Sequence, residues 1–508
     1  MSTFHGLEMA KQALFTQQMG LYTTGHNISN VNTEGYSRQR VNFETLSPYP
    51  SASRNRPQMP GQIGQGVKAG TVQRMRDSFL DTQYRSQTSR ASYWSTKTDA
   101  LSRMESVMNE ISGGDGLNKV LDDFWKSLQS LSTNATNSGA RDVVANKGLA
   151  VAETFKYLST SLEGIRTDLK TQIGDADGTS GKLGDANSLL RQINSLNKQI
   201  SEIEPHGYLP NDLYDQRDVL IDQLSQIVNI KVTYEKSSNS SLDIADGIAN
   251  IELEDATGNS FNPAFSLLTK GDMTKADSEL KKFTIAYGDG ENNSISEIKF
   301  GDTVVPIDKV DGSLKALSEN YGIKNGDKNY YTKMLSDLDK MASEFIKAFN
   351  EIHSSGYGLD GTTGRNFFTG TKASDINVSS EILQNTDAIA ASLEANNKGD
   401  GQNMLKLSDV ITEPISGLGT NTSVKTYYQK LIGELAVNTQ EAGRNAKNTA
   451  LQQANVQNDR LSVSAVSLDE EMTNLLKFQH AYNASARSMT AMDELLDKII
   501  NSMGLVGR

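Results

Sequence analysis

Three aspartates stand at a spacing that acid–base chemistry could use. Asp212, Asp215 and Asp218 recur every three residues on either side of Arg217, so they would lie near one another on a helix. Two carboxylates brought together in a cleft can act as general acid and general base. Spacing by three is also typical of a solvated helix edge whose acids pair with Arg, and the sequence favours that structural role.

Other patterns that could carry metal chemistry are incomplete. The histidines are too widely separated to form a metal site on one helix; they are His5, His26, His206, His353 and His480. GDADGTSG at 174–181 resembles half of a calcium loop, with Asp175 and Asp177 as the first ligands. Ala186 stands where a Glu would close such a loop, so we expect a turn between helices.

Glycine-rich motifs for nucleotides and nucleophiles are also missing. GQIGQG at 61–66 has the wrong glycine spacing for a dinucleotide-binding loop, and neither GxxxxGK[ST] nor GxSxG occurs. Its glycines are expected to serve tight turns. We therefore expect no enzyme, with no catalytic, metal-binding or cofactor-binding residues.

Composition excludes several classes of function. The 508 residues include 62 acidic and 50 basic side chains, a net charge of −12. Nucleic acids and anionic membrane surfaces both attract basic proteins, so we expect neither as a partner. The sequence has no apolar run of the ~18 residues that a membrane helix needs and no signal-peptide pattern at its start. Cysteine is absent, which excludes disulfides and thiol catalysis.

The elements that would position these residues are mainly long helices. Proline is absent from 61–204 and from 415–508, which permits helices without interruption. Apolar residues recur at steps of three and four in 117–131, 144–169, 189–203, 211–229 and 328–353. From 230 to 308, short β-branched runs alternate with Gly, Asn and Asp turns, which indicates a small strand-rich domain.

The predicted fold is mainly α with a β-rich insert, in which paired terminal helices flank a long helical bundle and a small β domain interrupts the middle. The predicted segments in chain order are an N-terminal helix at 1–35, the first part of the bundle at 36–229, a β-rich inserted domain at 230–310, the return part of the bundle with mixed loops at 311–465, and a C-terminal helix at 466–508.

Both terminal helices carry an apolar stripe with the seven-residue spacing of a coiled-coil seam. The stripe residues are Leu7, Leu14 and Leu21 in the first helix and Leu475, Tyr482, Met489 and Leu496 in the last. One helix cannot bury such a stripe alone. We expect the two chain ends to pair with each other or with the ends of neighbouring copies, and these seven residues are the predicted subunit-assembly residues.

A turn-rich polar segment follows the first helix. GLYTTGHNISNVNTEGYSRQRV at 20–41 resembles the N-terminal motif shared by bacterial flagellar rod, hook and hook-associated proteins. The matching residues are Asn27, Asn30, Asn32, Gly35, Tyr36, Arg38 and Gln39. The segments 211–230, 345–368 and 463–504 resemble the hook-associated members of this family, and the four blocks stand in the expected order.

The resemblance implies a structural subunit that joins hook to filament and so supports motility. Family members pass unfolded through the flagellar type III export channel and fold at the growing tip, where their terminal helices form the inner axial core. The implied partners are copies of the chain in a ring, the hook protein, a second hook-associated junction protein on the filament side, an export chaperone and the type III export apparatus. The implied location is secreted and extracellular, at the hook–filament junction.

Two alternatives remain at the level of sequence. Hook and distal rod proteins share the N-terminal motif, so the chain could be another axial component; a secreted enzyme with an inserted β domain is the alternative from a different class. Within the motif, Asn side chains favour caps and turns and Gly35 tolerates positive φ. We expect a shaped connector, after which Tyr36 and Val41 begin a strand or an extended arm.

Overall fold

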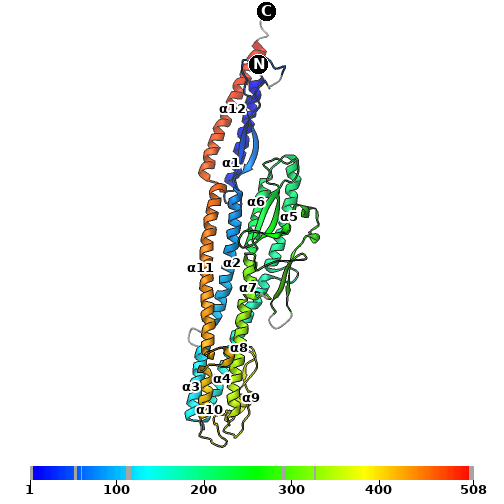
Figure 1. The fold of residues 1–508 in the computed structure, drawn as a ribbon. Helices are drawn as coiled ribbons and strands as arrows, with labels where there is room; N and C mark the ends of the chain where they lie inside the picture. Colours follow the sequence, from blue (N-terminus) through cyan, green and yellow to red (C-terminus); the bar gives the residue numbers. More distant parts are fainter. Residues whose placement is uncertain are drawn as a thin grey trace, which may run out of the picture.

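The chain forms a long rod with one domain attached along its side (Figure 1). The computed structural model describes residues 4–50, 54–58, 60–109, 116–288, 293–324, 326 and 328–502. The start of α1 and the end of α12, the described residues nearest the two termini, lie at the same end of the rod. The predicted fold class is confirmed, since long helices dominate and the strands form small antiparallel sheets.

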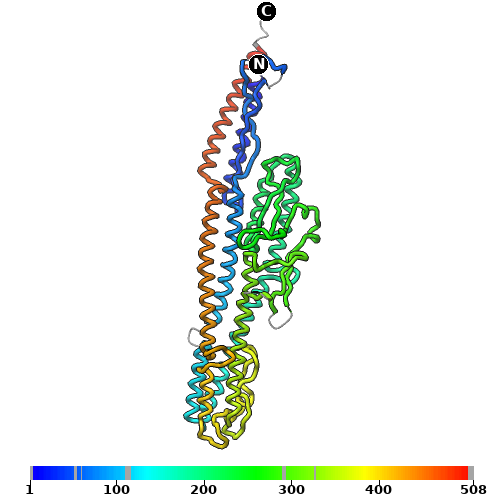
Figure 2. Tube along the Cα trace, in the orientation of Figure 1, coloured from blue at the N-terminus to red at the C-terminus, as the bar shows by residue number. Residues whose placement is uncertain are grey.

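Two antiparallel helices form the narrow end of the rod. α1 (Phe4–Ser29) packs against α12 (Leu468–Ser502), as Figures 1 and 2 show. A hairpin of β1 (Gln39–Thr45) and β2 (Val67–Arg74) follows α1 and packs along it. The Thr16 hydroxyl of α1 donates to the carbonyl of Val67 at 3.2 Å. The structure thus confirms that the chain ends pair, and it places a strand shortly after Tyr36. We call α1 and α12 together the terminal pair.

The middle of the rod is another antiparallel pair, formed by α2 (Ser78–Asn109) and α11 (Val424–Ser464). α11 ends at an extended residue, Ala465, with φ −74° and ψ 151°. α12 then begins three residues further on and continues toward the chain ends (Figure 2). The short break between α11 and α12 therefore divides the rod into two parts. One part is the terminal pair, and we call the rest of the rod the body.

The far end of the rod is a helical bundle of α3 (Leu117–Thr133), α4 (Ser138–Ile173), α8 (Tyr330–Ser355) and α10 (Gln402–Thr412). The predicted apolar stripes face inward, and aromatic rings fill the centre, with centroids 4.8–6.0 Å apart; they are Phe124, Phe345, Phe349, Phe367 and Phe368. Short elements close the bundle; they are β9 (Phe368–Thr369), β10 (Asn377–Val378) and α9 (Ser380–Gln384).

The side domain combines three helices with two small sheets. The helices are α5 (Gly181–Ile203), α6 (Asn211–Ile227) and α7 (Ser313–Tyr321). One antiparallel sheet contains β3 (Ile230–Glu235), β4 (Ile248–Glu254) and β5 (Ser260–Leu268), in that order. The other contains β6 (Phe283–Tyr287), β7 (Ile295–Phe300) and β8 (Thr303–Val304). α5 packs against β4, β5 and β6, although the sequence placed it in the bundle; the five-segment division stays a prediction.

The turn before α5 has the structure expected from its sequence. The Asp175 carboxylate accepts the backbone N–H groups of Thr179 and Ser180 at 2.6 and 3.1 Å. These hydrogen bonds shape the connection from α4 to α5. Asp175 therefore stabilises a turn between helices, as predicted.

Candidate assembly surface on the terminal helices

The seven predicted assembly residues are partly covered by the packing of the terminal pair and its hairpin. Leu496 is buried, with 7% of its surface exposed. The others are half-buried; they are Leu7, Leu14, Leu21, Leu475, Tyr482 and Met489. Polar residues elsewhere on the same helices, such as Lys11 and Asn483, are exposed. The stripes therefore serve packing within one chain, and their role in assembly stays a prediction.

Two glycines allow α1 and α12 to approach closely. A Cβ at Gly20 would lie 3.1 Å from the ring of Phe478, and a Cβ at Gly6 would lie 3.1 Å from the Met492 side chain. The two contacts are 14 residues apart on each helix, which is two heptads. The helices thus keep one antiparallel register, with bulky α12 side chains seated over α1 glycines. These two contacts were not predicted from the sequence.

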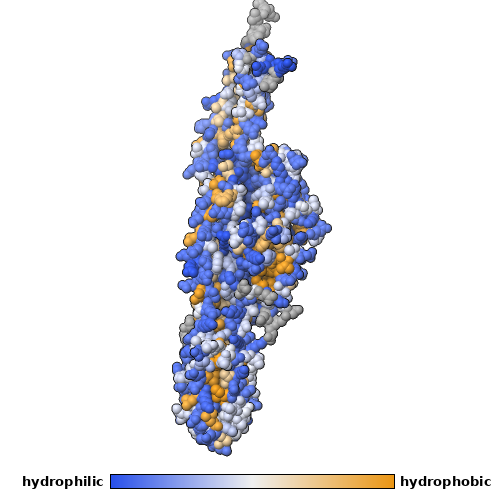
Figure 3. All heavy atoms as spheres, in the orientation of Figure 1, coloured by the Kyte–Doolittle hydropathy of each residue, from blue (hydrophilic) through white to orange (hydrophobic). Residues whose placement is uncertain are grey.

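A further set of apolar side chains on the two helices is exposed, and none of them is among the seven predicted assembly residues. These residues are 37% to 68% exposed; they are Phe4, Phe15, Met19, Tyr22, Leu468, Met472, Leu476, Met492, Leu495, Ile499 and Ile500. Many are three or four residues apart, so they lie together on helix faces. Apolar patches are visible along the terminal pair in Figure 3. We call this set the outer face; its signal in the sequence was a second apolar series beside the heptad stripe.

Asn27, at the end of α1, joins three segments of the chain. Its side-chain N–H groups donate to the carbonyl of Gln39 at 2.8 Å and to the Glu471 carboxylate at 3.1 Å. Its side-chain oxygen accepts the backbone N–H of Gln39 at 2.9 Å and the Tyr36 hydroxyl at 2.7 Å. The amide is buried, and all its hydrogen-bonding groups are used, so the end of α1, the first residue of β1 and the start of α12 are held together.

Gly35 lets the motif loop lie directly on α6. Its φ is +77°, and a Cβ there would lie 2.0 Å from Cγ2 of Val219. Both the backbone conformation and the space therefore require glycine. Tyr36 follows, with its hydroxyl 3.0 Å from Nδ1 of His26. Gly35 and Tyr36 thus fix the path of the chain from α1 to β1.

Arg38 and Gln39 connect the loop to the start of α12 and to α6. The Arg38 guanidinium pairs with Glu471 at 2.7 Å and with Glu470 at 2.6 Å. Its backbone N–H donates to the carbonyl of Ser464, the last residue of α11, at 2.9 Å. The Gln39 side chain donates to Asp212 at 3.1 Å. The motif thus spans the break between α11 and α12 and ties it to the side domain.

The remaining motif asparagines have local roles. The Asn30 side chain donates to the carbonyl of His26 at 3.1 Å and accepts the Thr33 hydroxyl at 3.1 Å, so it closes the end of α1. Asn32 is exposed at the turn. The motif is therefore a connector, as the family resemblance implied.

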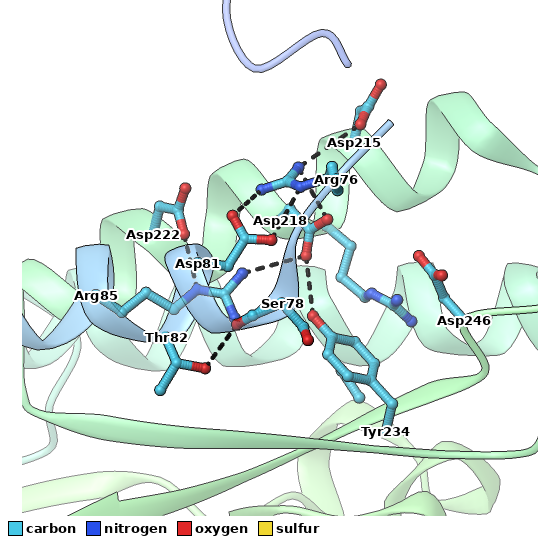
Figure 4. A network of polar contacts seen from close by, with 12 residues as sticks. Arg76, Ser78, Asp81, Thr82, Arg85, Asp215, Asp218, Asp222, Tyr234 and Asp246 are labelled. Atoms are coloured by element: carbon cyan, nitrogen blue, oxygen red, sulfur yellow. Dashed lines mark hydrogen bonds and ion pairs between the residues drawn. The ribbon is translucent and has the colours of Figure 1, made fainter. Parts of the chain in front are cut away.

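Behind the motif lies a buried cluster of Arg and Asp side chains, shown in Figure 4. The Arg side chains are Arg74, Arg76, Arg85 and Arg460, and the Asp side chains are Asp81, Asp215, Asp218, Asp222 and Asp246. Arg74 lies 2.6 Å from Asp215, and Arg460 lies 2.6 Å from Asp81. The cluster joins β2, α2, α6 and α11. The prediction of a solvated helix edge is wrong for Asp215 and Asp218, because partners distant in sequence bury them; Asp212 is exposed as predicted.

Two carboxylates of the cluster, Asp218 and Asp81, are held in their charged form. Burial alone would raise the pKa of Asp218, but Arg76, Arg74, Arg85 and Arg217 outweigh it and hold that pKa well below its ordinary value. The pKa of Asp81 is lowered too, since Arg76 donates to it and Arg460 lies close, against the opposing effect of burial. Carboxylates whose charge is balanced by buried Arg side chains hold the surrounding elements together through ion pairs. A carboxyl with a pKa this low is a poor general base at neutral pH.

The other residues considered for chemistry have structural surroundings. His353 is buried, with Nδ1 2.8 Å from the carbonyl of Arg365 and Nε2 accepting the N–H of Ala390 at 3.0 Å. Within the described ranges, no group of three or more His, Asp or Glu side chains is arranged to hold a metal ion. In those ranges, too, no helix is both long enough and apolar enough to cross a membrane.

A rod that carries paired terminal helices at one end, with a polar anchor at their base and exposed apolar side chains along them, fits the class of structural subunits. Residues 101–368 match the family described as flagellar hook-associated protein FlgK helical domain, and residues 457–503 match the flagellar basal body rod FlgEFG protein C-terminal family. The chain is 46% identical to flagellar hook-associated protein 1 of Bacillus subtilis (strain 168), over 100% of both chains. It belongs to the flagellar hook-associated protein 1 family.

A further relative and a solved structure are also similar to this chain. The chain is 28% identical to flagellar hook-associated protein 1 of Salmonella typhimurium, over 71% of this chain and 58% of that protein. The fold is similar to that of the flagellar hook junction protein FlgK from Burkholderia pseudomallei, with a TM-score of 0.56 and 12% identity, covering 75% of this chain and 100% of that one. At that identity the likeness supports the fold alone.

Proposed function

We propose that this chain is a structural subunit of the bacterial flagellum that joins hook to filament and is assembled at the distal hook end after export. One observation carries the proposal: a chain that matches flagellar hook-associated protein 1 over its full length leaves an apolar outer face exposed on its terminal pair. Contiguous exposed apolar surface marks interaction sites in soluble proteins.

Assembly would bury this outer face between copies. Burying one Leu, Met or Phe side chain contributes about 1.5–3 kcal/mol. Association costs roughly 4–15 kcal/mol in translational and rotational freedom, so a few side chains buried at each contact suffice to offset it. The anchor formed by the motif and the Arg–Asp cluster would keep the terminal pair aligned with the body, so that every copy presents the same face.

The finer assignments rest on the family resemblance. The proposed partners are copies of the chain in a ring, the hook protein, a second hook-associated junction protein on the filament side, an export chaperone and the type III export apparatus. The proposed location is secreted and extracellular, at the hook–filament junction. We propose no catalytic activity, because Asp215, Asp218 and His353 are engaged in ion pairs and hydrogen bonds that hold the fold.

Substitution on the outer face tests the proposal. Leu476→Asp places a charge at a residue that is 52% exposed, so the chain should fold and be exported but fail to remain at hook ends. Asn483→Asp, at an exposed polar position of α12, is the matched control and should incorporate normally. Immunolabelling of detached flagella locates each variant. Normal incorporation of Leu476→Asp would contradict the role of the outer face, and labelling along the whole hook would favour the alternative of a hook or rod protein.

A further inference from the structure

A cavity lies at the base of the terminal pair, where the motif loop meets the side domain. Its volume is about 650 Å³, and the end of α1 and the motif loop enclose it together with α5 and α6. The apolar part of its lining consists of Leu196, Leu220 and Val219. Among the described residues that line it, the carboxylates are Glu34, Asp212 and Asp215, and none is Lys or Arg.

The cavity is electrically negative. Asp215 is compensated from outside the cavity, by Arg74 at 2.6 Å, whereas Asp212 accepts only from the neutral Gln39 side chain at 3.1 Å among its side-chain contacts, and Glu34 is exposed. Tyr36 lines the same cavity. Burial raises the pKa of its hydroxyl most, and the negative charges of Asp212 and Asp215 raise that pKa further. The cavity therefore suits a cationic group with a short apolar neighbour.

The same chain carries a matching segment at the other end of its terminal pair. The hairpin loop at 46–66 has two charged residues, Arg54 and Arg56, and both are exposed. Four prolines in this loop restrict its backbone and reduce the entropy lost on docking. The described part of the loop lies beside the start of α1 and the end of α12 in Figures 1 and 2, and the 26 residues of α1 correspond to about 39 Å of helix. The loop therefore cannot reach the cavity of its own chain.

We propose that the cavity of one copy receives the Arg54–Arg56 segment of the hairpin loop of a second copy. The guanidinium groups would pair with Glu34 and Asp212, and Pro57 would contact the apolar lining. The contact joins two different patches, so it is heterologous and generates a ring or a helical stack. The inference rests on the proposed function, because it requires copies to assemble at the hook tip with the hairpin loop of one copy against the cavity of the next.

Cross-linking tests the contact directly, because the natural chain has no cysteine. Asn55→Cys marks the hairpin loop and Gln199→Cys marks the cavity wall, and both positions are exposed. Cells producing both variants should give a mixed dimer when isolated hook ends are oxidised, whereas either variant alone should not. Asn55→Cys combined with Lys447→Cys on α11 is the control pair and should give none.

The outcomes separate this inference from the proposed function. Hook ends that contain both variants but yield no mixed dimer would overturn the contact and leave the function standing. Absence of the unmodified chain from hook ends would instead overturn the function. A mixed dimer formed only in free solution, without hook ends, would also count against a contact made in the assembly.

Charge exchange gives a second readout. Arg54→Glu with Arg56→Glu should lower incorporation about tenfold, since two exposed ion pairs are together worth about 1.4 kcal/mol. Adding Glu34→Lys, Gln192→Lys and Gln199→Lys should restore it by reversing the charge of the cavity. Arg444→Glu with Lys447→Glu, at exposed cations of α11, makes the same charge change elsewhere and should incorporate normally. Unchanged incorporation of the loop variant, or no recovery with the reversed cavity, would overturn the contact.

Discussion

Replacing Gly35 by Ala tests how the motif loop is held against α6. The φ of +77° costs an ordinary L-residue about 1–2 kcal/mol. The added Cβ would also lie 2.0 Å from Cγ2 of Val219, so the loop or the valine must move, and such overpacking costs about 1–3 kcal/mol. Gly35→Ala should therefore weaken the contact between loop and α6 by about 2–5 kcal/mol.

Amide hydrogen exchange of the full chain measures this effect. The lower limit of 2 kcal/mol corresponds to a loss of protection of about thirtyfold in residues 27–40. Gly35→Ala with Val219→Ala removes the overlap but keeps the backbone cost, so the double variant should be more protected than the sum of single effects predicts. Gly25→Ala is the control, because nothing lies within 4 Å of its added Cβ and Ala favours the helix by about 0.5–1 kcal/mol.

Two results would refute this reasoning. Parental exchange in Gly35→Ala would show that neither the positive φ nor the close approach constrains the loop. Strictly additive effects of Gly35→Ala and Val219→Ala would show that the two side chains do not compete for the same space, contrary to the 2.0 Å approach.

Three further predictions concern charges. Asp218→Asn should destabilise the body by about 3–5 kcal/mol in denaturant unfolding, because it leaves buried guanidinium groups uncompensated. Glu471→Gln should speed amide exchange where α11 meets α12, because Glu471 is buried and pairs with Arg38 across this break. Burial lowers the pKa of His353 from 6.5 to about 4; the unfolded chain therefore binds this proton first, and stability should fall from about pH 6.5 to about pH 4 by about 3 kcal/mol, a slope that His353→Gln should remove.

Matched substitutions give the controls for these predictions. Asp246→Asn alters a carboxylate of the same cluster that is 39% exposed and should cost much less than Asp218→Asn. Asp469→Asn and His480→Gln change exposed residues of α12 and should leave exchange and pH dependence unchanged. Equal effects of Asp218→Asn and Asp246→Asn would contradict the importance of burial, and a pH slope that survives in His353→Gln would assign it to other groups.

Local patterns in the sequence were sufficient to predict the helices and the order of the elements. The apolar period indicated a helix at 211–229, and the structure has α6 at Asn211–Ile227; it indicated one at 328–353, and the structure has α8 at Tyr330–Ser355. Such periods record which face of each helix is covered, and this is a local property. The fold class followed from these periods together with the β-branched runs and turn residues of 230–308.

The polar anchor could not be derived in this way. Asn27 meets Glu471 from 444 residues away, and Arg74 meets Asp215 from 141 residues away. Spacing along α6 suggested that its acids face solvent, because nothing local shows that β2 and α2 bring Arg side chains to them. The motif identified the family, but its geometry depends on segments that meet only in the folded chain. The seam of the terminal pair could not be derived from local patterns either. The close approach of Phe478 from α12, and not the conformation of α1, requires glycine at position 20.

The terminal pair is the least buried part of the rod, and this predicts its behaviour before assembly. α12 has 35 residues, yet Glu471 and Leu496 are its only buried positions among those described; the buried residues of α1 are small or polar. Helices gain most of their stability from burial of an apolar face, so opening of this pair should cost little free energy. In the free chain, amides of α1 and α12 should exchange faster than those of α4, and protection should rise in isolated hook ends, where copies cover the outer face. If α12 in the free chain were as protected as α4, the contacts between α1 and α12 alone would stabilise the terminal pair. Covering the outer face in the assembly would then make new contacts between copies without making the two helices more ordered.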